Sequence, residues 1–66
     1  MIDEMVERSR LLLTIPQVCE RLQLGRSSVY LLIADGHLAT LRFGRAVRVP
    51  LASVEELIRE RLAESR

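Results

Sequence analysis

Residues 14–49 of this 66-residue chain, TIPQVCERLQLGRSSVYLLIADGHLATLRFGRAVRV, decide its fold. The first part of the segment holds two short amphipathic patterns separated by Leu24-Gly25. The second part, residues 41–49, alternates in polarity around Gly44. This order predicts two helices joined by a tight turn and followed by a β-hairpin with Arg45 at its tip.

The first helix is predicted to start at Thr14 and to run to about Leu22. Thr14 and Gln17 stand three residues apart and form a capping box, while Pro16 lies in the first turn, where its missing N–H costs little. Apolar residues recur at i, i+3, i+4 and i+7 and form one inward stripe: Ile15, Val18, Cys19 and Leu22. Because Cys19 lies on this stripe, we interpret it as a buried small hydrophobe rather than a reactive thiol. Leu24 is expected to fill the corner between the two helices.

The second helix is predicted over residues 26–34, with a core stripe of Val29, Leu32 and Ile33. The opposite face carries Ser27, Tyr30, Leu31 and Ala34, with Arg26 and Ser28 near the first turn. Of these, four suit a helix whose N-terminal end enters the major groove of DNA: Arg26, Ser27, Ser28 and Tyr30. The same pattern would also suit the polar face of an ordinary core helix.

Asp35-Gly36-His37-Leu38 predicts where this helix stops, with Gly36 left-handed and Leu38 folding back on the helix. His37 is expected to be exposed just past the helix end. No second ligand or nucleophile accompanies it, which argues against a metal or acid–base site.

For the hairpin, the pattern favours a three-residue loop, Gly44-Arg45-Ala46. In that register Phe43 faces Val47, Leu41 faces Val49 and Arg42 faces Arg48, so the apolar side chains share one face. A two-residue loop would instead pair Leu41 with Arg48 and mix the faces. Two facing arginines with a third at the tip favour contact with a phosphate backbone or a narrow minor groove. The alternative is that solvent alone accommodates them.

The flanking segments complete one domain over residues 11–62. Residues 11–13 form a short apolar run that either adds an edge strand to the hairpin or packs into the core. A final helix is predicted over residues 51–62, with an inward stripe of Val54, Leu57, Ile58 and Leu62 and with Ser53 and Glu56 as an alternative capping box. Residues 1–10 are interpreted as an arm or frayed helix and residues 63–66 as a tail. The predicted fold is mostly α with a small β-hairpin.

Length and composition exclude several classes of protein. A chain of 66 residues buries too little surface to enclose a deep catalytic pocket as well as a core, so an enzyme is disfavoured. Its apolar runs are too short to cross a bilayer and its N-terminus does not resemble a signal peptide. The single cysteine forms no internal disulfide and has no neighbour at metal-ligand spacing. We therefore expect a cytoplasmic protein without a metal or cofactor.

The net charge of +1 hides an uneven distribution along the chain. Residues 1–20 carry −2 and residues 51–66 carry −1, whereas residues 21–50 carry +4. One face is therefore expected to be electropositive. All ten basic residues are arginine, whose planar fork suits phosphate and guanine edges, although a GC-rich genome would also favour arginine codons.

Four pieces of sequence occur in a characteristic order: Leu13-Thr14-Ile15-Pro16-Gln17-Val18, Leu24-Gly25-Arg26-Ser27-Ser28-Val29-Tyr30, Asp35-Gly36-His37-Leu38, and Leu41-Arg42-Phe43-Gly44-Arg45 through Val49-Pro50. Together they resemble the excisionase-type winged helix-turn-helix family, relatives of the MerR DNA-binding domain. The resemblance implies a recognition helix at residues 26–34, with Leu31 among its contacts, and a DNA-binding wing carrying Arg42, Arg45 and Arg48. Two residues depart from the family: Gly25 stands where Ser is frequent, and Leu31 where a basic residue is common.

The resemblance also implies a function. Small members of the family are recombination directionality factors that bind tandem sites on double-stranded DNA, bend it and direct a tyrosine or serine integrase toward excision. Because a single small module gains little affinity from one site, copies are expected to associate head to tail on DNA. No long dimerisation helix follows Leu62, so no small-molecule effector is expected. The alternatives are a small transcriptional regulator, as a repressor or activator, and a protein-interaction adaptor.

Overall fold

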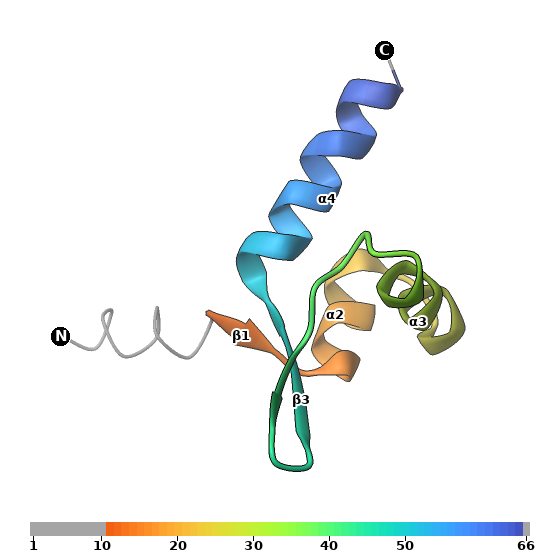
Figure 1. The fold of residues 1–66 in the computed structure, drawn as a ribbon. Helices are drawn as coiled ribbons and strands as arrows, with labels where there is room; N and C mark the ends of the chain where they lie inside the picture. The colour runs from red at the N-terminus through yellow and green to blue at the C-terminus, as the bar shows by residue number, and fades with distance from the viewer. Residues whose placement is uncertain (1–10, 66) are drawn as a thin grey trace, which may run out of the picture.

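The computed structural model describes residues 11–65 and contains three helices and a small antiparallel sheet (Figure 1). In chain order the elements are β1 (Leu12–Leu13), α2 (Ile15–Leu22), α3 (Arg26–Ala34), β2 (Leu41–Phe43), β3 (Ala46–Pro50) and α4 (Leu51–Glu64). The predicted arm, residues 1–10, lies outside the described residues. In Figure 1, α2 and α3 pack beside the sheet, the hairpin points away at one end, and α4 leaves the body at the other.

Helix α2 begins as its sequence predicts, with Thr14 as the N-cap. The Thr14 hydroxyl accepts a hydrogen bond from the backbone N–H of Gln17 at 3.2 Å, and the Thr14 N–H donates to the Gln17 side-chain oxygen at 2.9 Å. Both halves of the capping box are thus present, which satisfies two donors that the first helical turn leaves without partners. The helix spans Ile15–Leu22, as expected from the apolar stripe.

Removing this cap is expected to destabilise the whole domain. Thr14→Ala deletes the hydroxyl acceptor and should lower the free energy of unfolding by about 1 kcal/mol. Urea denaturation followed by circular dichroism measures the change. Thr40→Ala provides a matched control, because Thr40 is exposed and lies between helices and strands. Equal stability of the two variants would show that the cap contributes nothing.

The turn between α2 and α3 is closed by Gln23 in the left-handed conformation, with φ 57°. The N–H of Leu24 donates back to the carbonyl of Cys19 at 3.0 Å, and the Gln23 side-chain amide donates to the carbonyl of Glu20 at 2.9 Å. The expectation that Leu24 fills the corner between the helices is wrong, because its side chain is 40% exposed. The backbone bonds shape the turn and leave this leucine at the surface.

Helix α3 begins after Gly25 and ends at Ala34, as predicted. Gly36 has φ 82°, and the N–H of His37 donates to the carbonyl of Leu32 at 2.8 Å. Leu38, which follows, is buried. The helix therefore stops in the predicted left-handed glycine turn.

The sheet has the strand order β1-β3-β2, with β3 in the centre. Strand β1 pairs with β3 through Leu13 opposite Val49, which confirms the edge-strand reading of residues 11–13. Just beyond the strands, the N–H of Leu51 donates to the carbonyl of Leu11 at 2.9 Å. Apolar side chains of β1 and β3 thus meet on the face that packs against the helices.

The hairpin register differs from the prediction. Leu41 pairs with Arg48, Arg42 with Val47 and Phe43 with Ala46, so the loop consists of two residues, Gly44 and Arg45. Gly44 has φ 64° while Arg45 has a negative φ, the pattern of a II′ turn, whose twist matches that of the strands. The register therefore follows the geometry of the turn and does not separate apolar from polar side chains onto different faces.

This register divides the hairpin side chains between two faces. Directly opposite residues share a face and successive residues alternate, so Arg42 lies on the inner face with Val47 and Val49. Leu41, Phe43 and Arg48 lie together on the outer face. The prediction that all apolar residues share one face, with Arg42 opposite Arg48, is therefore wrong.

Helix α4 follows Pro50 directly and extends to Glu64, two residues beyond the predicted end. Ser53 does not cap it; its hydroxyl accepts a hydrogen bond from the N–H of Ala39 at 2.9 Å. Val54 and Leu57 are buried as predicted, but Ile58 and Leu62 are exposed. The helix is longer than the body it packs on, so only its first two turns reach the core.

Every described helix and strand except β2 contributes to the core, and the connection after α3 adds one residue. The buried apolar side chains are Leu13, Ile15, Val18, Val29, Leu38, Val49, Val54 and Leu57. Cys19, Leu32 and Ile33 pack against them from partly buried positions. Cys19 is thus half-buried and not fully enclosed. Because β2 lies outside the core, its apolar residues have no buried position to fill.

Candidate nucleic-acid interface

Helix α3 presents its predicted contact residues to solvent. Arg26, Ser27, Ser28, Tyr30 and Leu31 are all exposed, while Val29 between them is fully buried. Gly25 at the N-cap supplies no side-chain hydrogen bond to the first turn. The N–H groups at this end, with the positive end of the helix dipole, are therefore oriented toward any anion that approaches.

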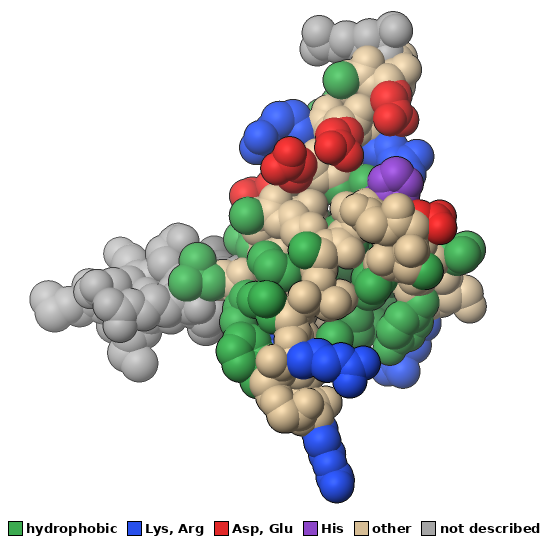
Figure 2. Space-filling model, in the orientation of Figure 1, with side chains coloured by type: hydrophobic (Ala, Val, Ile, Leu, Met, Phe, Trp, Pro, Cys, Tyr) green, Lys and Arg blue, Asp and Glu red, His purple; other side chains and the backbone are tan. Residues whose placement is uncertain are grey.

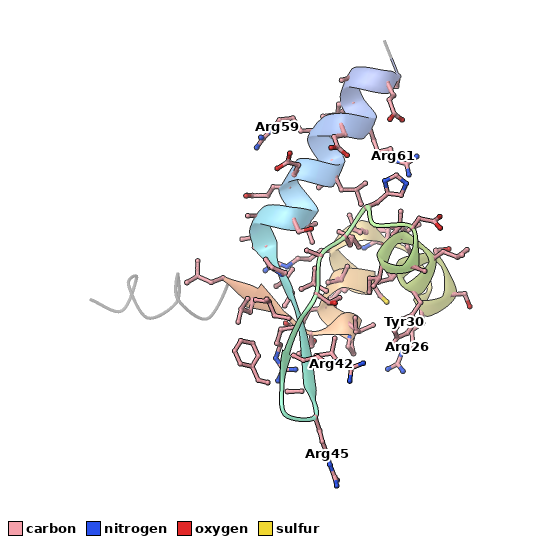
Figure 3. The ribbon with its side chains drawn as sticks, in the orientation of Figure 1. Arg26, Tyr30, Arg42, Arg45, Arg59 and Arg61 are labelled. Carbon is pink, nitrogen blue, oxygen red and sulfur yellow. The ribbon has the colours of Figure 1, made fainter. Side chains whose placement is uncertain are left out.

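The hairpin places two arginines at the same end of the molecule as α3. Figure 3 shows Arg42 on the side of the hairpin nearer α3, Arg45 projecting from the turn, and Arg26 and Tyr30 beside them on α3. The inner-face position of Arg42 follows from its pairing with Val47. Three cationic side chains, one from α3 and two from the hairpin, thus share one end of the fold.

Most of the acidic side chains within residues 11–65 lie at the opposite end. In Figure 2 they gather mainly over α4, whereas arginine side chains project from the hairpin end. The acidic residues of α4 are Glu55, Glu56, Glu60 and Glu64, and Arg59 and Arg61 on the same helix lie far from the hairpin in Figure 3. For the basic middle segment and the acidic last helix, the charge separation along the sequence is therefore a separation in space as well.

Arg48, the third predicted wing residue, has different surroundings. It lies on the outer face of the sheet, where it is half-buried, and one guanidinium nitrogen donates to the carbonyl of Val47 at 2.9 Å. Of the three predicted wing residues, Arg42 and Arg45 lie near α3. Arg48 lies on the opposite face of the hairpin from Arg42.

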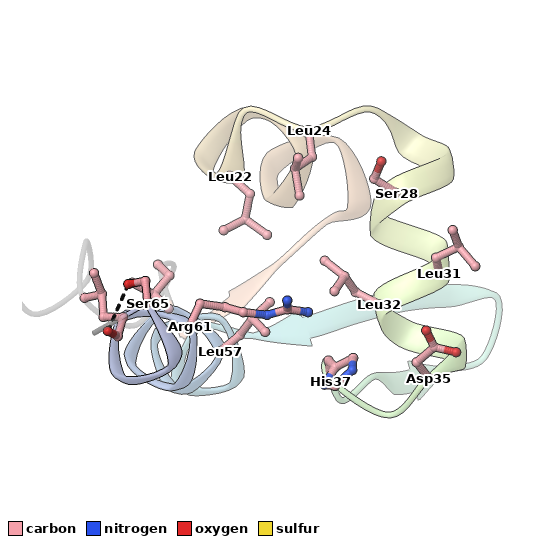
Figure 4. Close-up of a pocket in the computed structure, with 12 residues that line it drawn as sticks. Leu22, Leu24, Ser28, Leu31, Leu32, Asp35, His37, Leu57, Arg61 and Ser65 are labelled. Atoms are coloured by element: carbon pink, nitrogen blue, oxygen red, sulfur yellow. Dashed lines mark hydrogen bonds between the residues drawn. The ribbon is translucent and has the colours of Figure 1, made fainter.

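A groove that was not predicted runs between α3 and α4. Its volume is about 660 Å³, and its apolar walls come from Leu22, Leu24, Leu31, Leu32, Leu57, Ile58 and Leu62. Figure 4 shows Arg61 reaching from α4 across the groove toward the end of α3, where Asp35 and His37 lie. The feature of the sequence that could have indicated this groove is the length of the apolar stripe on the last helix. The stripe continues past the residues that a small core can bury.

Possible metal ligands are dispersed in the part of the chain that the structure describes. His37 is exposed, as expected, and within residues 11–65 no group of three His, Cys, Asp or Glu side chains could hold a metal ion. None of the described helices is long and apolar enough to cross a membrane.

The fold is that of a winged helix-turn-helix protein: α2 and α3 form the helix-turn-helix, and the hairpin is the wing. Arginines of α3 and of the hairpin together make one end of the molecule basic. The comparisons agree, since residues 12–62 match the helix-turn-helix domain family. An excisionase of Streptomyces ambofaciens is 44% identical over 54 residues, which cover 82% of this chain and 87% of the relative. A probable excisionase of Saccharopolyspora erythraea is 32% identical over 56 residues, covering 85% of this chain and 57% of that protein. No solved structure matches.

The chain therefore belongs to the excisionase-type helix-turn-helix family. This membership makes it an excisionase-like DNA-binding protein and not an enzyme. The resemblance to the excisionase-type family seen in the sequence is thus confirmed, whereas the relation to the MerR DNA-binding domain stays a prediction.

Proposed function

We propose that this protein is a recombination directionality factor: it binds tandem sites on double-stranded DNA in the cytoplasm, bends the DNA and directs an integrase toward excision. The observation that carries the proposal is the placement of Arg26, Arg42 and Arg45 at one end of a helix-turn-helix. The similarity to two proteins named as excisionases supports the specific role.

In this proposal α3 enters the major groove and the hairpin contacts the neighbouring backbone. Arg26, Ser27 and Ser28 lie in the first turn, where a docked helix contacts base edges and phosphate. The Tyr30 hydroxyl reaches a phosphate, and Leu31 faces the base edges. On the wing, Arg45 inserts toward the minor groove and Arg42 binds the phosphates between the two grooves. Arg48 contributes less, through its charge alone.

Neighbouring copies bound to tandem sites are proposed to contact one another head to tail. The outer face of the hairpin carries exposed Leu41 and Phe43 next to Arg48. The far end of α4 carries exposed Ile58 and Leu62, with Glu55 on the same side of the helix at i, i+3 and i+7 spacing. An apolar patch beside a cation would thus meet an apolar stripe beside an anion on the next copy.

Binding to duplexes with one or two sites tests this contact. We expect the second site to fill with about fivefold higher affinity than an isolated site, equivalent to about 1 kcal/mol of coupling. Phe43→Ser or Leu62→Ser should abolish the coupling and leave single-site affinity unchanged, because each removes one side of the apolar contact. Independent filling of both sites by the wild type would refute head-to-tail association.

The role in recombination is tested directly in a reconstituted reaction. A tyrosine or serine integrase is supplied with the DNA junctions that form on integration, and excision is measured with and without this protein. Stimulated excision together with suppressed integration supports the proposal. Strong DNA binding with no effect on either direction for an integrase encoded beside the gene would instead indicate a transcriptional regulator.

A further inference from the structure

The side chains of α3 are unusual for a helix that reads DNA. The helix sequence is RSSVYLLIA, and Arg26 at its first position is the only arginine, lysine, asparagine or glutamine in it. Arginine, lysine, asparagine and glutamine make the paired hydrogen bonds that distinguish purines in the major groove. Beyond the first turn, α3 can therefore make no such paired contact.

The outward surface beyond the first turn is instead mostly apolar. Leu31 is 62% exposed, and Ala34, one turn further along, is exposed as well. Ser27, one turn before Leu31, has a short side chain that lets the helix backbone approach closely. Among Ser27, Leu31 and Ala34, which follow one another along this surface, Leu31 has the longest side chain, and it ends in methyl groups. Tyr30 beside it is longer and is 52% exposed, but it ends in a hydroxyl group.

The thymine methyl group is the one apolar feature on the major-groove edge of an unmodified base pair. An exposed leucine pressed against the groove loses water without forming hydrogen bonds, so the contact is favourable where it meets a methyl group and unfavourable where it covers polar base edges. The apolar surface of α3 around Leu31 is thus expected to favour thymine over the other bases.

We propose that Leu31 reads thymine, through apolar contact between its methyl groups and the C5 methyl group of a thymine in the major groove. The inference rests on the proposed function, because it requires α3 to be docked in that groove. Leu31 also lies at the edge of the α3–α4 groove, so the test must detect contact with the base itself.

Replacing thymine by deoxyuridine removes the methyl group alone and leaves the base-pairing edge intact. Starting from a single-site duplex selected for binding, each thymine is replaced in turn and the dissociation constant is measured. We expect wild-type affinity to fall about fourfold at one or two thymines, the change that corresponds to about 0.8 kcal/mol for one buried carbon. For Leu31→Ala the thymine and deoxyuridine duplexes should bind equally.

Leu11→Ala is the matched control, because Leu11 is equally exposed at 62% and lies on the sheet side of the molecule. This variant should keep the full preference for thymine. Circular dichroism of Leu31→Ala verifies that the exposed position leaves the fold intact.

Two outcomes would overturn the proposal while leaving DNA binding in place: a wild type that binds all deoxyuridine duplexes as well as the parent, or a Leu31→Ala variant that keeps the preference. Failure of the wild type to bind any duplex at low salt would refute the proposed function itself and this inference with it.

Discussion

Replacing Arg42 and Arg45 together with Ala is expected to lower affinity for a single-site duplex about 100-fold at low salt. Each substitution removes a charge-assisted hydrogen bond to the backbone or minor groove, and about tenfold for each corresponds to about 1.4 kcal/mol. The dependence of affinity on salt should also become weaker. Each phosphate neutralised contributes about 0.9 to the logarithmic slope, so the slope should fall by about 2. Fluorescence anisotropy over a range of salt concentrations measures both quantities.

The control for this double variant is Arg59→Ala with Arg61→Ala. It removes the same charge from the same molecule, but from α4, at the opposite end from the hairpin in Figure 3. Affinity and slope should change little, since exposed charges separated from the DNA by more than a Debye length are screened. If the two double variants weaken binding equally, the effect reflects net charge alone and the hairpin is not a DNA-binding wing.

The helices could be predicted from the sequence because their limits depend on local signals. The capping box of Thr14 and Gln17 forms between residues three apart, and the stop at Gly36 depends on the conformational freedom of one glycine. Neither requires knowledge of what packs against the helix. The first two helices therefore begin and end where their sequences indicate.

Which side chains of the hairpin and of the last helix are buried depends on how far the core extends. The extent of the core cannot be predicted from a single sequence. The predicted register assumed that Leu41 and Phe43 must be buried, yet β2 lies beyond the core and leaves both exposed. The same assumption placed Ile58 and Leu62 inside. In each case the apolar side chain lies too far from the centre of the fold for the core residues to cover it. The exposed Ile58 and Leu62 form part of the apolar wall of the α3–α4 groove.

Because the hairpin has a two-residue loop, Arg42 and Arg48 lie on opposite faces of it. Replacing each arginine singly therefore shows which face of the hairpin binds DNA. In a three-residue loop the two would face each other and their replacements would have similar effects. In the observed register Arg42 lies on the inner face opposite Val47, whereas Arg48 lies on the outer face and donates to the carbonyl of Val47. We therefore expect Arg42→Ala to weaken binding about tenfold and Arg48→Ala less than about threefold on a single-site duplex.

The same pair of variants also distinguishes the two faces of the hairpin on tandem sites. Arg48 lies beside Leu41 and Phe43 on the face proposed to meet the next copy, so Arg48→Ala should reduce the coupling between sites. Arg42→Ala should leave the coupling unchanged while it lowers the affinity of every site. Equal losses from both variants on a single site would mean that the hairpin binds DNA through both faces. The register would then not decide which arginine contacts DNA, and the neighbouring copy would have to bind elsewhere.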